Sequence, residues 1–144
     1  MPDLSIIIVN FNGEKYLIPC IESVIKYCEN INHEIIVVDN NSADGSAQSL
    51  KEKFPHINLI DNKTNLGFAK ENNIGVKHAK GHHILLLNND TLLLNELSPA
   101  INLLKNDSSI GIIGIQMLDA QNRPIISYGH FPKFYNFLKL KTLQ

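Results

Sequence analysis

The chain has 144 residues, of which 44% are hydrophobic and 19% charged, a balance typical of a folded domain with its own core. The formal net charge of −1 at pH 7 excludes the strongly basic surface of a nucleic-acid-binding protein, so no nucleic-acid partner is expected. The strongest apolar runs, 6–9 and 84–87, are far shorter than the roughly 20 residues of a membrane span.

Strands and helices alternate along the chain. Residues 4–9 form a β-branched run that predicts a strand buried on both faces, and apolar residues at helical spacing predict a helix over 14–28. The same patterns continue with strands at 34–38, 57–61 and 84–87, helices at 46–54, 67–79 and 98–105, and strands at 110–118 and 125–127. This order predicts one α/β domain over 1–144, with a Rossmann-like, mostly parallel sheet flanked by helices.

Polar clusters follow three of the predicted strands, at 10–12, 39–41 and 88–90. Right-handed crossovers place the carboxyl ends of parallel strands along one edge of the sheet, where ligands bind in such folds. Asn and Asp also form turns without any ligand, which is the alternative explanation for each cluster taken singly. Three clusters on one edge favour a binding site.

Two carboxylates in these clusters are candidate ligand-binding groups. Asp39 ends a strand and can accept hydrogen bonds from a base or a ribose. Asp90 follows two asparagines, and a carboxylate beside amide oxygens suits Mg²⁺ or Mn²⁺, which share their ligands with phosphates and water. A helix cap or turn is the alternative for Asp90. The histidines lack paired metal-ligand spacing, so no zinc site is expected.

The two cysteines, Cys20 and Cys28, lie eight positions apart in a predicted helix. Their Cα atoms would be about 12 Å apart, too far for a disulfide. Buried reduced thiols are therefore expected, which favours a cytoplasmic location.

Two nucleotide-binding classes are disfavoured by the turn at 10–13, which holds one glycine and no basic residue. A dinucleotide fingerprint or a P-loop needs a glycine-rich turn at this place. A nucleotidyltransferase would need basic residues there to hold a triphosphate, and is a less favoured alternative.

Four motifs occur in order: 5–12 (SIIIVNFN), 34–45 (EIIVVDNNSADG), 65–75 (NLGFAKENNIG) and 84–91 (ILLLNNDT). Together they resemble the family-2 inverting glycosyltransferases of the GT-A fold. The last motif looks like the family's Asp-x-Asp metal motif in an Asn-Asn-Asp form, similar to that of rhamnosyltransferase-like members. Residues 110–129 continue the resemblance more weakly.

The resemblance implies a role for each motif residue. Asp90 would bind Mg²⁺ or Mn²⁺ at the donor diphosphate, and Asn88, in place of the first acid, would leave metal binding weak without nucleotide. Asn89 would lie near the donor sugar or ribose. The donor would be a UDP- or dTDP-linked sugar, transferred with inversion to a glycan or lipid-linked acceptor. The base and ribose would be held by Val9, Asn10, Asn12 and Asp39, with Gly67 and Asn73 closing the same pocket.

The family's catalytic base is a carboxylate well downstream of the metal motif. After Asp107 the only acid is Asp119, in an evident turn, so the base is expected beyond Gln144 and no catalytic residue is assigned in this chain. The chain is thus expected to be the donor-binding, N-terminal portion of a longer, truncated glycosyltransferase. The alternative is a non-catalytic nucleotide-sugar-binding or scaffold module.

The aromatic segment 128–144 is expected to be a tail that lacks its packing partner. Its alternative is a peripheral membrane contact, which would place the protein at the inner face of the membrane.

Overall fold

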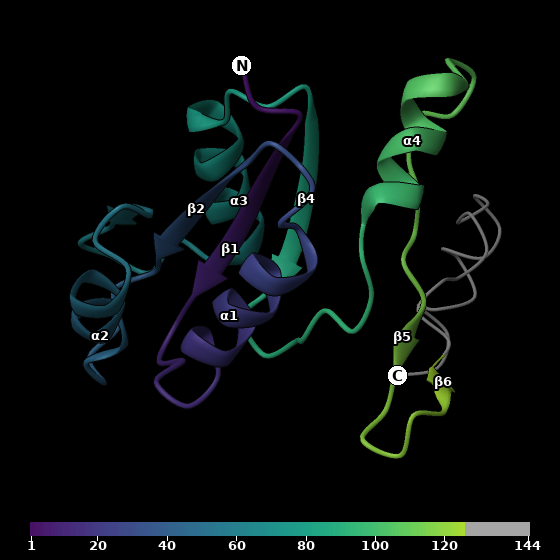
Figure 1. Cartoon of the computed structure of the whole chain (residues 1–144). Helices are drawn as coiled ribbons and strands as arrows, with labels where there is room; N and C mark the ends of the chain where they lie inside the picture. The colour runs from purple at the N-terminus through teal and green to yellow at the C-terminus, as the bar shows by residue number, and fades with distance from the viewer. Residues whose placement is uncertain (126–144) are drawn as a thin grey trace, which may run out of the picture. The chain divides into compact units, whose positions relative to one another are not determined.

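The structure is a computed structural model that describes residues 1–125 (Figure 1). The predicted strand residues 126–127 and the predicted tail lie outside the described residues. The chain divides into two compact units, Met1–Asn106 and Asp107–Gln144, and each is described by itself. The interpretation of 1–144 as a single domain stays a prediction.

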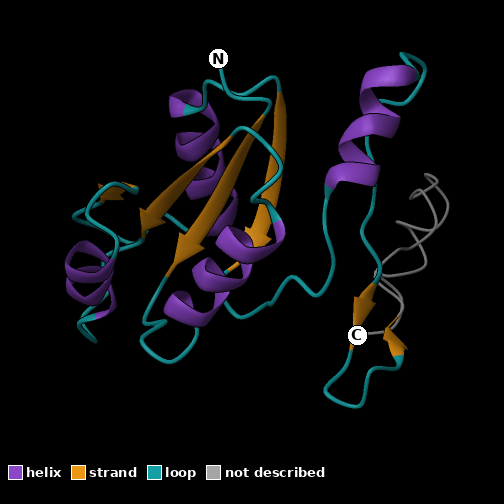
Figure 2. Cartoon of the chain, viewed as in Figure 1, coloured by secondary structure: helices purple, strands orange, loops and turns teal. Residues whose placement is uncertain are grey.

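The first unit is built on one parallel sheet of four strands in the order β3-β2-β1-β4 (Figure 2). Strand and helix alternate along the chain, so the predicted α/β fold with a parallel sheet is confirmed. The strands are β1 (Leu4–Asn10), β2 (His33–Asp39), β3 (Asn58–Asp61) and β4 (His83–Asn88).

The first unit also contains four helices, and their residue ranges are close to the predicted ones. The first begins three residues later than predicted, because the amides of Tyr16 and Leu17 both donate to the carbonyl of Gly13 and form a turn ahead of the helix. The helices are α1 (Leu17–Tyr27), α2 (Ser46–Lys53), α3 (Phe68–His78) and α4 (Ser98–Asn106).

The sheet is covered on both faces, with α1 on one side and α3 on the other (Figure 1). Successive side chains of a strand point to opposite faces, so Ile6 and Ile8 of β1 pack with α1 while Ile7 packs on the side of α3. All three are fully buried, and each such side chain contributes about 1.5–3 kcal/mol relative to an exposed one. This packing holds the strand ends, and the loops that leave them, in place.

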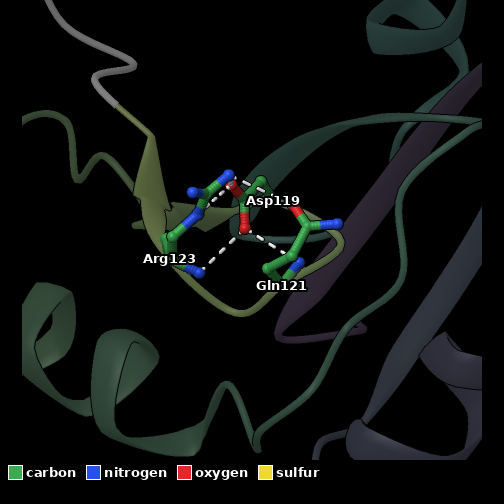
Figure 3. A network of polar contacts seen from close by, with 3 residues as sticks. All are labelled: Asp119, Gln121 and Arg123. Carbon is green, nitrogen blue, oxygen red and sulfur yellow. Dashed lines mark hydrogen bonds and ion pairs between the residues drawn. The ribbon is translucent and has the colours of Figure 1, made fainter.

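The described part of the second unit contains an antiparallel pair, β5 (Met117–Leu118) and β6 (Pro124–Ile125). The turn between them is held by the Asp119 carboxylate, which accepts hydrogen bonds from the backbone amides of Gln121 and Arg123 and from the Arg123 guanidinium (Figure 3). These bonds, the Arg123 side chain first, lower the pKa of Asp119.

The predicted strand at 110–118 is much shorter than expected. Only Met117–Leu118 is extended and paired, and residues 111–116 form no strand within the described part of the chain. Ile112 is 91% exposed. A β-branched run favours an extended backbone, but a strand also needs a neighbour for its ladder. No helix in residues 1–125 has the length and apolar character needed to cross a membrane.

Candidate functional site

A cleft of about 370 Å³ opens at the carboxyl end of the sheet, as the three polar clusters predicted. The strand registers bring Asn10 level with Asp39, and Val9 level with Asn88. The cleft belongs entirely to the first unit, and its lining residues are Val9, Phe11, Asn40, Asn65, Gly67, Phe68, Asn88, Asn89 and Asp90.

The predicted site residues fall into two groups. The cleft is lined by four of them, Val9, Gly67, Asn89 and Asp90. The other four do not line it: Asn10 and Asp39 lie buried behind it, and Asn12 and Asn73 are exposed.

Asp39 organises the loop that follows β2. Its Oδ1 accepts from the Asn10 amide at 2.7 Å and from the Ser42 hydroxyl at 2.7 Å, while its Oδ2 accepts from the Ser42 backbone amide at 2.9 Å. The side chain is 2% exposed. A buried carboxylate with three donors is well compensated, so Asp39 shapes the wall behind the cleft.

Asn12 joins the turn after β1 to the same loop. Its backbone amide donates to the Ser42 hydroxyl, and its side-chain oxygen accepts from the Ala43 amide. The residue has φ 50°, a left-handed conformation that asparagine tolerates better than most residues. A nucleotide contact by Asn12 stays a prediction.

Asn40 fixes the segment at 65–67, which also lines the cleft. Its amide group donates to the Asn65 side chain at 3.0 Å, and its oxygen accepts from the Leu66 backbone amide at 2.8 Å. Gly67 follows with φ 84° and ψ 156°, a backbone conformation that is almost confined to glycine. Neither Asn40 nor Asn65 was predicted as a site residue, although both lie inside the quoted motifs.

The turn after β4 carries the predicted metal ligand. The carbonyl of Asn88 accepts from the backbone amide and hydroxyl of Thr91 and from the Cys20 thiol, at 3.3, 2.7 and 3.5 Å. Asp90 is exposed at the end of this turn. Burial, with the charge of Asp90 adding to it, raises the pKa of Cys20 to about 12. Both Cys20 and Cys28 are buried and free, as predicted.

Two aromatic side chains line the cleft: Phe11, which lies within the predicted cluster at 10–12 but was given no role of its own, and Phe68, which was not predicted. Phe11 and Phe68 are 50% and 58% exposed, unusual for phenylalanine, and both border the cleft. An exposed aromatic in a polar turn after a buried strand is a sequence signal that could have identified Phe11. Such a ring offers a flat apolar face for stacking.

Among the described residues that line the cleft, Asp90 is the only charged one, and none is a lysine or arginine. An anionic ligand would therefore meet a negative charge with no lysine or arginine among the lining residues of the described chain. At about 4 Å, two like charges repel by roughly 1 kcal/mol in water and by more where water is excluded.

The oxygen atoms in the cleft fit a hard divalent cation. One carboxylate and neighbouring amide oxygens are the donor types that Mg²⁺ and Mn²⁺ prefer. Within residues 1–125, no group of three or more His, Cys, Asp or Glu side chains could hold a metal by itself. An ion here would need further oxygen ligands from a bound molecule or from water.

Known proteins with this sequence pattern identify the family. The family model described as Glycosyl transferase family 2 matches residues 5–144. The chain belongs to this family. It is 32% identical over 129 residues to the minor teichoic acid biosynthesis protein GgaB of Bacillus subtilis, covering 84% of this chain and 14% of that protein. It is 28% identical over 93 residues to the glycosyltransferase GlyG of Streptococcus pneumoniae, covering 62% of this chain and 31% of that protein.

Solved structures of glycosyltransferases share the fold. Residues 1–349 of TarS from S. aureus, in complex with UDP, superpose with a TM-score of 0.61 at 28% identity, over 72% of this chain and 32% of that one. The mannosyltransferase PcManGT from Pyrobaculum calidifontis, in complex with GDP-Man and Mn²⁺, matches with a TM-score of 0.61 at 21% identity, over 71% of this chain and 31% of that one. The sheet and its helices are thus those of the GT-A fold, and the chain spans less than a third of each of these four proteins.

Proposed function

We propose that the first unit binds a nucleotide-diphosphate sugar in the cleft and that the protein transfers the sugar to an acceptor. The observation that carries the proposal is the cleft at the carboxyl end of the sheet, with Asp90 on one side and exposed aromatics at its border. The family membership and the UDP complex of TarS support the same ligand class.

Dependence on a divalent cation follows from the charge of the cleft. A diphosphate carries at least two negative charges and would lie beside Asp90, where none of the lining residues within 1–125 is a lysine or arginine. A bound Mg²⁺ or Mn²⁺ would neutralise the diphosphate and stabilise the departing nucleotide as a Lewis acid. We propose that Asp90 holds this ion together with diphosphate oxygens, and that nucleotide and metal bind together.

The base of the nucleotide would bind at the aromatic border of the cleft. Phe11 and Phe68 are exposed there, and stacking of a base on an aromatic ring contributes roughly 1–3 kcal/mol. Asn40 and Asn65 beside them are already bonded to one another, so they shape the pocket. The choice between UDP and dTDP, and the rhamnosyltransferase-like branch, stay predictions.

Transfer with inversion needs a base that takes the proton of the acceptor hydroxyl. The described residues hold three acids downstream of the metal motif. Asp119 is engaged with Arg123 and Asp107 with the hydroxyl and amide of Ser109, while Glu96 is exposed and is not among the residues that line the cleft. We therefore propose that the base comes from outside this chain's 144 residues, and that this chain mainly binds the donor and the metal. The glycan or lipid-linked acceptor and the cytoplasmic location are parts of the same proposal.

Calorimetric titration with UDP and with dTDP, in Mn²⁺ and in a chelator, tests the proposal. At least one nucleotide should bind tenfold or more tightly with Mn²⁺, and Asp90→Asn should remove most of that gain. Equal affinity in metal and chelator would contradict the metal role. The matched control is Asp61→Asn, because Asp61 ends β3 on the same edge, is exposed and lies outside the cleft lining.

The aromatic contribution is measured in the same titration. Phe11→Ala should weaken nucleotide binding about tenfold in metal and in chelator alike, because stacking does not involve the diphosphate. Tyr16→Ala is the control, since Tyr16 is 55% exposed on the same stretch of chain but does not line the cleft. Equal effects of the two changes would place the base elsewhere.

A further inference from the structure

The Asn10 side chain connects the loop after β2 to the turn after β4. Its Nδ2 donates to Asp39 Oδ1 at 2.7 Å and to the Ser46 hydroxyl at 2.8 Å, and its Oδ1 accepts from Asn89 Nδ2 at 3.0 Å. Asn10 is fully buried, whereas Asn89 is half-buried and lines the cleft beside Asp90. Two amides thus link a buried carboxylate to the ligand-facing turn.

The Asp39 carboxylate decides which way both amides face. A carboxylate that already receives donors on both oxygens acts as an acceptor, so Asn10 must turn its NH₂ toward Asp39. The Asn10 oxygen is then left facing Asn89. Two oxygens 3 Å apart would repel, so Asn89 must turn its NH₂ toward Asn10. The Asn89 oxygen, on the other side of the planar amide, is left without a donor among residues 1–125.

Gly13 provides an independent sign that this contact is built into the fold. The glycine is buried, and a Cβ atom at this position would lie closer than 3.0 Å to both Asn10 Oδ1 and Asn89 Nδ2. The two amides therefore meet over a residue with no side chain. Any larger residue would push them apart.

We propose that Asp39, Asn10 and Asn89 form an amide relay, which turns the Asn89 carbonyl oxygen into the cleft as an acceptor for a hydroxyl group of the bound nucleotide sugar. Asn10 is then a positioning residue that acts through Asn89. Only the identity of the ligand, a nucleotide sugar, depends on the proposed function. The orientation itself follows from contacts within the protein.

Replacement of Asn89 by two different residues separates the relay from a simple contact. Asn89→Asp keeps an acceptor oxygen toward the cleft but sets a second oxygen against Asn10 Oδ1. Asn89→Ala removes the acceptor altogether. Each change is made in the natural chain and in an Asn10→Ser background, where the opposing amide oxygen is gone and a hydroxyl donor remains beside Asp39.

UDP affinity in the presence of Mn²⁺ is the readout. Asn89→Asp should weaken binding about tenfold when Asn10 is present and by less than twofold in the Asn10→Ser background, while Asn89→Ala should weaken it in both. An equal effect of Asn89→Asp in the two backgrounds overturns the relay. Should Asn10→Ser fail to fold, Gly13→Ala serves as the second background, because it also separates the amides.

A second measurement distinguishes failure of the proposed function from failure of the relay. If the natural chain does not bind UDP with Mn²⁺, the ligand assignment fails, and the same set of variants is compared by urea unfolding without ligand. The relay then predicts that Asn89→Asp lowers the unfolding midpoint when Asn10 is present and leaves it unchanged with Asn10→Ser. Equal midpoint shifts in both backgrounds overturn the relay.

Discussion

Two polar segments border the same end of the sheet, yet their side chains are used in opposite ways. The loop at 39–46 is partly buried, and its Asp39, Ser42 and Ser46 side chains bond mainly to one another and to Asn10. The turn at 88–90 is more exposed, and Asn89 and Asp90 face the cleft. The buried, bonded side chains of Asp39, Ser42 and Ser46 therefore act as scaffold, and of this loop only Asn40 is among the described residues that line the cleft, whereas Asn89 and Asp90 are both ligand-facing.

The largest expected effect contrasts Asp39→Asn with Asp90→Asn. At position 39 an amide places two N–H donors where the neighbouring groups are donors themselves, so we expect a loss of about 3 kcal/mol in the free energy of unfolding. At position 90 we expect a change within about 0.5 kcal/mol, because the side chain is exposed. Urea denaturation measures both. Similar stability losses for the two variants would break the distinction between scaffold and ligand-facing segments.

A smaller loss of stability is expected from a change at Gly67, which lines the cleft. A Cβ atom there would meet nothing within 4 Å, so Gly67→Ala tests the backbone conformation alone, and we expect a cost of about 1–3 kcal/mol. Gly111→Ala is the control, because that site is equally open and its φ is not left-handed. If thermal unfolding shows no difference between the two variants, the 65–67 segment is not held in the conformation described.

The smallest effect concerns the thiol beneath the ligand-facing turn. The folded-state pKa of Cys20 is raised to about 12, so the stabilisation from the protonated thiol is complete below the unfolded pKa of about 8.5 and is lost as the pH rises toward the folded value. Because the charge of Asp90 adds to this shift, Asp90→Asn should lower the pKa of Cys20 slightly. Thiolate absorbance during an alkaline titration of a Cys28→Ala variant measures it, with Asp61→Asn as the control.

A bound divalent ion at Asp90 should shift the Cys20 pKa in the same direction, since it also cancels the negative charge. A Cys20 pKa that is unaffected both by Asp90→Asn and by Mn²⁺ with UDP would mean that the turn at 88–90 lies farther from the thiol than described.

Periodicity determined most of the fold. Isoleucine and valine runs at 4–9 and 34–38 predicted strands because β-branched side chains pack well on a pleated surface, and both strands formed in register. The run at 110–116 is also rich in isoleucine but contains Gly111 and Gly114, which weaken a strand, and within the described residues it has no ladder partner and formed no strand. Local propensity therefore sufficed only where the tertiary structure supplied a neighbour.

The sequence by itself determined the α/β class, the family and the edge of the sheet at which the cleft lies, because these follow from strand order and local patterns. It assigned Asn10, Asp39, Asn89 and Asp90 to one site. Only the tertiary structure decided that Asn10 and Asp39 are buried and fully engaged while Asn89 and Asp90 face the cleft. The physical reason is that burial and hydrogen bonds within the protein decide which oxygen atoms a ligand can reach, and hydrogen bonds between residues about 30 and 80 positions apart are invisible to local patterns.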